Sequence, residues 1–158
     1  MDHLWSPWRY RYVSTASSGA GCIFCAAHQA SDDKTNRVLL RAERNFVLLN
    51  AFPYTSGHLM IAPYTHVPTL EAAEPAALQE MILLAQRMET ALRKVYRPDG
   101  LNLGFNIGKG AGAGIEGHIH MHVLPRWTGD VNFMTSIGET RVLPEDLDTT
   151  YERLAAAI

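Results

Sequence analysis

Gly117-His118-Ile119-His120-Met121-His122-Val123-Leu124-Pro125 is the stretch of sequence that decides the fold. Polar and apolar residues alternate along it, which predicts a half-buried β-strand. Because successive side chains of a strand point to opposite faces, His118, His120 and His122 share one face. Imidazole can act as nucleophile, general acid or metal ligand near neutral pH. Three imidazoles on one strand face therefore indicate a functional site rather than a solvated polar surface.

Length and composition indicate one globular domain. The chain has 158 residues, enough for a substantial core, and shows no internal repeat. Its net charge of -2 gives no general attraction for nucleic acid, and no apolar run is long enough to span a bilayer. The N-terminus, Met1-Asp2-His3-Leu4-Trp5, lacks the apolar core of a signal peptide, so we expect a cytoplasmic protein. We predict a single domain over 1–158, in which 1–21 form an aromatic extension and a loop.

The rest of the chain predicts runs of strands around one long helix. Alternation and turn residues predict strands over 38–41, 46–49, 58–62 and 101–107, beside the histidine strand. The helix begins near Pro75 and ends before Pro98. Its predicted buried stripe consists of Leu78, Met81, Ile82, Ala85, Met88, Leu92 and Val95. A short C-terminal helix follows Pro144, with an apolar side made of Leu147, Tyr151, Leu154 and Ile158. This order predicts the α+β class with a mainly antiparallel sheet.

A glycine-rich loop, Gly108-Lys109-Gly110-Ala111-Gly112-Ala113-Gly114, leads into the histidine strand. Glycine lets the backbone approach a ligand closely, and consecutive N–H groups form an anion-binding concavity. Lys109 can add a charged contact to phosphate. The loop lacks the P-loop pattern, and no helix follows it as in a Rossmann fingerprint. Beside the histidines it favours a phosphate ligand over a plain hairpin connection.

A histidine nucleophile suits phosphorus chemistry. A neutral ring nitrogen can attack a phosphoryl centre and carry it as a phosphoramidate. No paired carboxylates lie near the histidines in the sequence, and no nucleophile-elbow pattern surrounds Thr135 or Ser136, which disfavours a serine hydrolase.

The two cysteines of the chain, Cys22 and Cys25, are spaced for metal binding or redox chemistry. A zinc site needs two further ligands, for which His66 and His118 are candidates. His28 is a rival ligand, although it is more simply a surface residue. Redox chemistry places such a pair at a helix N-terminus after a strand, and the Ser/Ala/Gly-rich loop before Cys22 disfavours that arrangement.

The N-terminal segment Trp5-Ser6-Pro7-Trp8-Arg9-Tyr10-Arg11-Tyr12 is aromatic and basic. It can stack on nucleotide bases or pack over the domain or a partner subunit, and packing is the simpler interpretation.

The segment His118 to Leu124 resembles the motif of the histidine triad (HIT) family, His-x-His-x-His followed by apolar residues. The stretch from Asn50 to His58 is similar to the loop and strand entry of that family. The segments 5–9 and 125–134 resemble its bacterial diadenosine-polyphosphate branch, so that the resemblance covers nearly the whole chain. It implies a HIT-like fold, a five-stranded, mainly antiparallel sheet with one long helix and a short C-terminal helix, paired into a homodimer with a continuous sheet.

The resemblance also implies roles for single residues. His120 matches the nucleophile that attacks an α-phosphate and forms a nucleotidyl-histidine intermediate, His122 matches the histidine that contacts the phosphate, and His118 completes the triad. The predicted nucleotide-binding residues are Asn50, His58 and Asn106 from the resemblance, and Lys109, Gly112 and Gly114 from the glycine-rich loop. The implied ligands of a structural zinc ion are Cys22, Cys25, His66 and His118.

One departure from the family pattern concerns the leaving group. Many members have Gln and then Ser or Thr shortly before the triad, whereas this chain has Gly114-Ile115-Glu116-Gly117, with Ile115 at the hydroxyl position. This departure weakens an inference to simple phosphoramidate hydrolysis.

The resemblance implies an enzyme that cleaves dinucleoside polyphosphates, such as diadenosine tri- or tetraphosphate. The nucleotidyl group would pass to His120 and then to water or phosphate. The alternatives are an adenosine phosphoramidate hydrolase and a nucleotide-binding sensor with incidental turnover. The expected partner is therefore a small-molecule nucleotide, with no role for nucleic acid or membrane. The acceptor, the base preference and the oligomer size stay open.

Overall fold

The computed structural model describes residues 21–131 and 143–158. The aromatic segment 5–12, Thr135, Ser136 and the end of the 125–134 segment therefore lie outside the described residues. Among the helices of the described residues, none is both long and apolar enough to cross a membrane.

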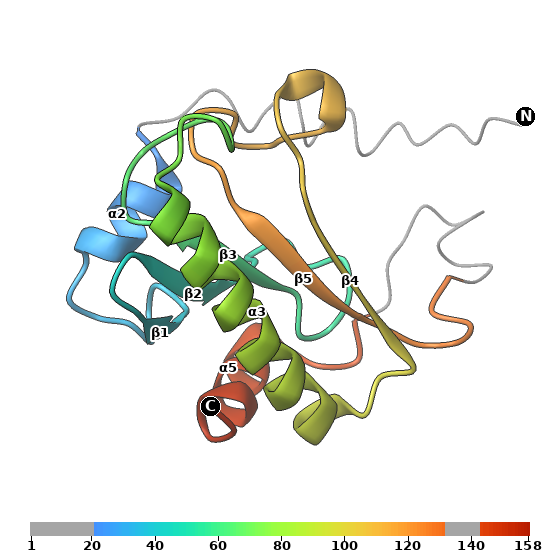
Figure 1. The fold of residues 1–158 in the computed structure, drawn as a ribbon. Helices are drawn as coiled ribbons and strands as arrows, with labels where there is room; N and C mark the ends of the chain where they lie inside the picture. The colour runs from blue at the N-terminus through green and yellow to red at the C-terminus, as the bar shows by residue number, and fades with distance from the viewer. Residues whose placement is uncertain (1–20, 132–142) are drawn as a thin grey trace, which may run out of the picture.

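A five-stranded antiparallel sheet lies at the centre of the fold (Figure 1). Its strands are β1 (Val38–Arg41), β2 (Asn45–Leu49), β3 (Leu59–Pro63), β4 (Gly100–Phe105) and β5 (Met121–Arg126). They lie in the order β1-β2-β3-β5-β4. The predicted α+β class and antiparallel sheet are confirmed, and β4 ends two residues before the predicted end at Ile107. β5 begins at Met121, so His118 and His120 precede the regular strand.

Helix α3 (Pro75–Tyr96) lies across one face of the sheet and has Pro75 at its first position, as predicted (Figure 1). Its buried residues are Ala77, Met81, Leu84, Ala85, Met88, Ala91 and Leu92. The prediction that Ile82 belongs to this stripe is wrong, because Ile82 is 59% exposed. Neighbouring residues of a helix lie roughly 100° apart around its axis, so burial of Met81 turns Ile82 toward the edge of the stripe.

Helices α2 (Ile23–Gln29) and α5 (Leu147–Ala155) complete the fold. Leu154 of α5 joins the cluster of buried residues between α3 and the sheet. Phe24 and Ala27 of α2 belong to a second cluster with residues of the opposite face, including Leu48 and Met60. The sheet is therefore covered on both faces, with α3 and α5 on one side and α2 on the other.

Candidate functional site

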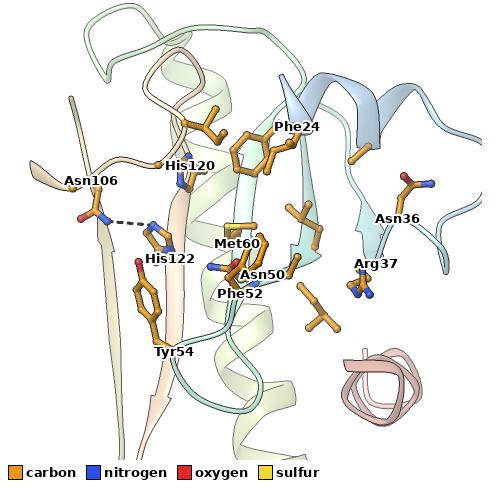
Figure 2. Close-up of a pocket in the computed structure, with 18 of the residues that line it drawn as sticks. Phe24, Asn36, Arg37, Asn50, Phe52, Tyr54, Met60, Asn106, His120 and His122 are labelled. Atoms are coloured by element: carbon orange, nitrogen blue, oxygen red, sulfur yellow. Dashed lines mark hydrogen bonds between the residues drawn. The ribbon is translucent and has the colours of Figure 1, made fainter. Parts of the chain in front are cut away.

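The face of the sheet that carries α2 forms the floor of a cavity of about 540 Å³ (Figure 2). Leu48 lies beside Met60, and Met60 lies beside His122, so these three side chains form one row across β2, β3 and β5. Next in this row is Gly104 of β4, which has no side chain. The volume is within the roughly 300–1,000 Å³ usual for small-molecule sites.

The cavity is polar at its two ends and apolar between them. His120, His122 and Asn106 lie at one end, and Asn36 and Arg37 lie at the other (Figure 2). Phe24 and Met60 lie between the two ends (Figure 2), and the apolar lining also includes Ile23, Ala27, Leu48 and Ile115. Asn50 and Tyr54 also line the cavity. Such a cavity suits an elongated ligand that has an anionic end and a flat apolar part.

The three triad histidines lie in a row of rings beneath α2. The ring centroid of Phe24 is 5.1 Å from that of His118 and 4.6 Å from that of His120. The His120 and His122 centroids are 4.9 Å apart. The three rings share one side, as predicted, but they are only 0%, 5% and 8% exposed. The prediction of a half-buried strand is therefore wrong, because α2 covers the polar face and α3 covers the apolar face.

His120 is held in one tautomer by its own backbone neighbourhood. Its Nδ1 atom lies 2.8 Å from the carbonyl oxygen of His118. Because a carbonyl oxygen only accepts hydrogen bonds, Nδ1 carries the proton and Nε2 carries the lone pair. Burial lowers the pKa of His120, which keeps the ring neutral at neutral pH. The cavity is thus lined by a neutral imidazole with an unprotonated Nε2.

A second chain of hydrogen bonds sets the proton positions in His58 and His122. The backbone N–H of Tyr54 donates to Nδ1 of His58 over 3.1 Å. His58 must then carry its proton on Nε2, which donates to Nδ1 of His122 over 2.9 Å. The side-chain nitrogen of Asn50 lies 3.3 Å from His58 Nδ1, and the Asn50 Oδ1 atom accepts from the backbone N–H of Phe52. Asn50 and His58 therefore belong to one buried network.

This chain leaves His122 with its proton on Nε2, at the cavity. Burial, together with the neighbouring His120, lowers the pKa of His122 to about 4, so this ring is neutral at neutral pH. The Nε2 atom lies 3.5 Å from the side-chain nitrogen of Asn106 (Figure 2). Both nitrogens are donors in this arrangement, so together they can hold one phosphoryl oxygen.

The glycine-rich loop contributes backbone to the cavity, but less than its sequence indicates. Gly112 and Gly114 line the cavity, whereas Lys109 is exposed and is not part of its lining. Lys109 to Ala111 form a single turn of 3₁₀-helix. The N–H groups of Ala111, Gly112 and Ala113 donate to carbonyls within the loop. The expectation of a run of available N–H groups is therefore wrong for these three residues.

Cys22, Cys25, His66 and His118 form a cluster of four possible metal ligands. Their ligand atoms all lie within 4.8 Å of one another. The Nδ1 atom of His118 is 3.3 Å from the sulfur of Cys22 and 3.7 Å from that of Cys25, and Nδ1 of His66 is 3.3 Å from the sulfur of Cys25. A tetrahedral ion with ordinary Zn–S and Zn–N bond lengths would separate sulfur and nitrogen by roughly 3.6 Å. The four residues therefore fit a tetrahedral metal ion.

His118 connects this cluster to the rest of the site. Its Nε2 atom lies 2.8 Å from the carbonyl oxygen of Pro63, so it carries the proton and leaves Nδ1 for a metal. The ring of His28 instead lies beside those of Phe46 and Tyr64, 6.0 Å and 5.4 Å away between centroids, and is not part of the cluster.

Helix α2 positions both the cluster and the cavity wall, and no helix is predicted there from the sequence. Cys22 is its N-cap, and Cys25 lies in its first turn, so the pair does lie at a helix N-terminus. Two histidine nitrogens at contact distance nevertheless distinguish it from a bare dithiol. The apolar residues Phe24 and Ala27, three positions apart, were the only signal of a buried helical face.

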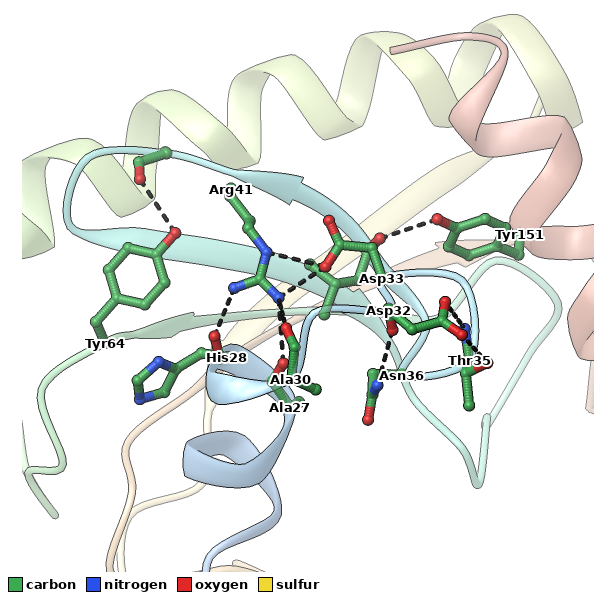
Figure 3. Close-up of polar contacts among 12 residues, drawn as sticks. Ala27, His28, Ala30, Asp32, Asp33, Thr35, Asn36, Arg41, Tyr64 and Tyr151 are labelled. Carbon is green, nitrogen blue, oxygen red and sulfur yellow. Dashed lines mark hydrogen bonds and ion pairs between the residues drawn. The ribbon is translucent and has the colours of Figure 1, made fainter.

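Arg41 of β1 holds the other end of α2 (Figure 3). Its guanidinium donates to the carbonyls of His28, over 2.7 Å, and Ala30, over 3.0 Å. It also donates twice to one carboxylate oxygen of Asp33, over 2.9 Å and 2.7 Å. The last carbonyls of a helix have no partners within it, and a cation there is favourable. Arg41 therefore joins α2 to β1 and to the loop before it.

Comparison with known proteins identifies relatives over most of the chain. Residues 31–129 match the HIT domain family. The "AP-4-A phosphorylase" of Mycobacterium tuberculosis is 36% identical over 98% of this chain and 83% of its own length. The "Bis(5'-adenosyl)-triphosphatase" of Dictyostelium discoideum is 28% identical over 59% of this chain and 62% of its own length.

A solved structure is similar to this fold as well as to its sequence. It is described as a Zn-bound histidine triad family protein from Mycobacterium smegmatis. It aligns with a TM-score of 0.69 and 31% identity, and the alignment covers 87% of this chain and 92% of the other.

Proposed function

Because the chain belongs to the HIT family, we propose that it cleaves dinucleoside polyphosphates by transferring a nucleotidyl group to His120. The observation that carries the proposal is the hydrogen bond from His120 Nδ1 to the carbonyl of His118, which leaves a neutral Nε2 lone pair at the cavity. Neutral imidazole is a competent nucleophile toward phosphorus. The names of the Mycobacterium and Dictyostelium relatives support the substrate class.

In the first step, Nε2 of His120 attacks the α-phosphorus, and the bond to the bridging oxygen breaks. The electron pair of that bond leaves with the remaining polyphosphate, which is an anion at neutral pH and needs no proton. His120 becomes a nucleotidyl-imidazolium, and its Nδ1 proton still points at the His118 carbonyl, which stabilises the new positive charge. His122 and Asn106 hold a non-bridging oxygen of the α-phosphate.

The substrate would lie along the length of the cavity. The α-phosphate would lie at the histidine end, Asn50 of the cavity lining would contact the ribose, and the base would lie among Phe24, Leu48 and Met60. A phosphoramidate substrate is less suitable, because its amine leaving group needs a proton. His122, with a pKa of about 4, is a poor proton donor at neutral pH.

For the second step we propose inorganic phosphate as the acceptor. A phosphate oxygen attacks the α-phosphorus, the bond to His120 breaks, and Nε2 recovers its lone pair. An anionic oxygen needs no base to remove a proton, whereas water does. Ile115 lines the cavity at the position where many family members have a hydroxyl, so this part of the wall offers an apolar side chain instead. The name of the Mycobacterium tuberculosis relative supports phosphorolysis.

We also propose that the cluster of Cys22, Cys25, His66 and His118 holds a structural zinc ion. Two thiolates and two imidazoles in tetrahedral reach are a donor set typical of structural zinc. The ion would supply no chemistry to the reaction and would hold α2 against the histidine strand. The Zn-bound relative from Mycobacterium smegmatis supports this assignment.

The test follows diadenosine tetraphosphate turnover in the wild type and in His120→Ala. We expect ADP and ATP as products in the presence of phosphate, and a loss of at least about 10³-fold in the variant, since the nucleophile itself is removed. AMP and ATP as the only products would overturn phosphorolysis, and full turnover by His120→Ala would overturn the covalent mechanism. His28→Ala is the matched control, because it also removes a histidine, but one that lies outside the cavity lining and outside the Cys22 cluster, and it should keep the wild-type turnover.

A further inference from the structure

Arg37 lies at the end of the cavity opposite the histidines, and the proposed reaction assigns it no role. Arg37 and Asn36 lie at this end (Figure 2), and the preceding residue, Thr35, also lines the cavity. The phosphate-binding groups, His122 and Asn106, lie at the other end. Phe24 and Met60 lie on the wall between the two ends. A group that Arg37 meets is therefore on the far side of the base from the phosphate.

The backbone around Arg37 is fixed by its own turn. The carboxylate of Asp32 accepts hydrogen bonds from the N–H and hydroxyl of Thr35, and the Asp32 carbonyl accepts from the side-chain nitrogen of Asn36 (Figure 3). Arg37 itself donates its N–H to the carbonyl of Lys34 and has a φ of 57°. This left-handed conformation is unfavourable for a residue with a side chain, and such conformations cluster at functional sites.

The guanidinium of Arg37 forms no ion pair with any of the described residues. Its Nε atom is buried and has no hydrogen-bond partner there. The nearby carboxylates are engaged elsewhere: Asp33 binds Arg41, and Glu152 binds Lys34. A buried donor without a partner is costly, which is a reason to expect a ligand acceptor.

We propose that Arg37 reads the edge of the base and that the site prefers a 6-oxopurine, such as guanine or hypoxanthine, over adenine. This inference rests on the proposed function, because it takes the occupant to be a nucleotide whose phosphate lies at the histidines. The preferred substrates are then dinucleoside polyphosphates with at least one 6-oxopurine base.

The chemistry of the purine edge gives the preference its direction. A 6-oxopurine presents two adjacent acceptors, O6 and N7, which match the parallel N–H groups of a guanidinium. Adenine has an amino group at C6, a donor that would face another donor. Asn36 donates its amide N–H to the Asp32 carbonyl, so its Oδ1 atom remains as an acceptor for the N1–H of a 6-oxopurine.

The experiment measures the dissociation constants of IMP and AMP for the metal-loaded protein by calorimetry. These ligands differ in the C6 substituent and the protonation of N1, and neither is turned over. We expect the wild type to bind IMP about tenfold more tightly than AMP. Arg37→Met should bring this ratio close to one. Arg37→Lys should give an intermediate ratio, because lysine keeps the positive charge and lacks the two parallel N–H donors of the guanidinium.

Lys34→Met is the matched control. It removes a positive charge three residues away, from a side chain that is not part of the cavity lining, and should leave the IMP-to-AMP ratio unchanged. Equal binding of IMP and AMP by the wild type, or an unchanged ratio in Arg37→Met, would overturn the role of Arg37 and leave the proposed function standing. If the folded wild type bound neither nucleotide, both proposals would fail. Methionine is as strained as arginine at this φ, so the variant and the wild type have comparable backbones.

Discussion

His120 and His122 of this site are neutral, and what each can do depends on which ring nitrogen carries its proton. The tautomers of His58, His120 and His122 follow from one backbone N–H, at Tyr54, and one carbonyl, at His118. Neither backbone group can exchange donor for acceptor, so the pattern of protons is set by the fold.

Gly117 illustrates how close the backbone comes to the metal cluster. A Cβ atom there would lie 3.1 Å from Nε2 of His66. We expect Gly117→Ala to displace the His66 ring and to weaken zinc binding by about tenfold, because ligand geometry sets affinity. Competition with a chelator measures this affinity, starting from about one zinc per wild-type chain. Gly110→Ala adds a Cβ in open space and should bind zinc like the wild type. Equal affinities in all three proteins would contradict the role assigned to His66.

Acid should destabilise the protein through His122. Its pKa is lowered from 6.5 to about 4, so between these values the unfolded chain binds a proton that the folded chain does not. Stability is therefore fully present above about pH 6.5 and falls as the pH drops toward 4, by ~3 kcal/mol from this residue. Urea unfolding of the wild type and His122→Gln measures the difference. His118 and His120, whose pKa values burial also lowers, should leave a residual slope in the variant. If the free energy of unfolding fell with pH equally in both proteins, the contribution assigned to His122 would be contradicted.

At the scale of the elements, helix α2 is held by contacts from elsewhere in the chain. We expect Arg41→Met to destabilise the protein by about 2 kcal/mol, because it leaves helix carbonyls and Asp33 without a charged donor. Thermal unfolding should show a drop of roughly 4–8 °C. Arg93→Met, which removes an exposed ion pair within α3, should change the midpoint little. A similar effect of both substitutions would argue against the anchoring of α2 by Arg41.

The same helix marks the limit of what the sequence predicts. α3 was predictable, because it is a helix of 22 residues that begins at Pro75 and carries apolar residues at helical spacing from Leu78 to Val95. β1 was predictable from a short apolar run between turns. α2 has only seven residues, too few for a clear period, and its helical state depends on burial of Phe24 and on Arg41, which is distant in sequence.

Some residues of the candidate site were predictable from the sequence, and others were not. The histidine alternation and the cysteine spacing are local patterns, and they led to the residues that the structure brings together. The role of Arg37 has no local signal, because its left-handed backbone arises where β1 pairs with β2 around a bulge. The exposed position of Lys109 was not predictable either, because the 3₁₀ turn uses the loop's own N–H groups.

At the scale of the whole molecule, the two edges of the sheet differ among the residues that the structure describes. The edge strand β1 is covered in part by α5, where the hydroxyl of Tyr151 donates to the carbonyl of Val38. β4 pairs with no further strand among the described residues, and Leu103 on it is 47% exposed. An open edge strand is a template for pairing with another chain. We therefore propose the family's homodimer, with β4 of each protomer side by side.

Light scattering tests this assembly. We expect the wild type to have twice the mass of one chain and Leu103→Glu to shift toward the monomer, because like charges then face each other across the two-fold axis. Leu70→Glu changes an exposed leucine away from β4 and should keep the wild-type mass. A monomeric wild type, or an equal shift in both variants, would contradict the β4 interface.

His118 has a consequence for anyone who redesigns this protein. Its ring reaches the cysteines through Nδ1, and its main-chain oxygen holds the proton of His120. His118 thus belongs both to the metal cluster and to the support of the nucleophile, two parts that a designer would want to vary separately. A variant without the cysteines would need another way to hold the peptide group at position 118. Without such support, a nucleophile at position 120 would lose its fixed orientation. Portability of the triad into another fold is limited by this shared peptide group more than by the histidines themselves.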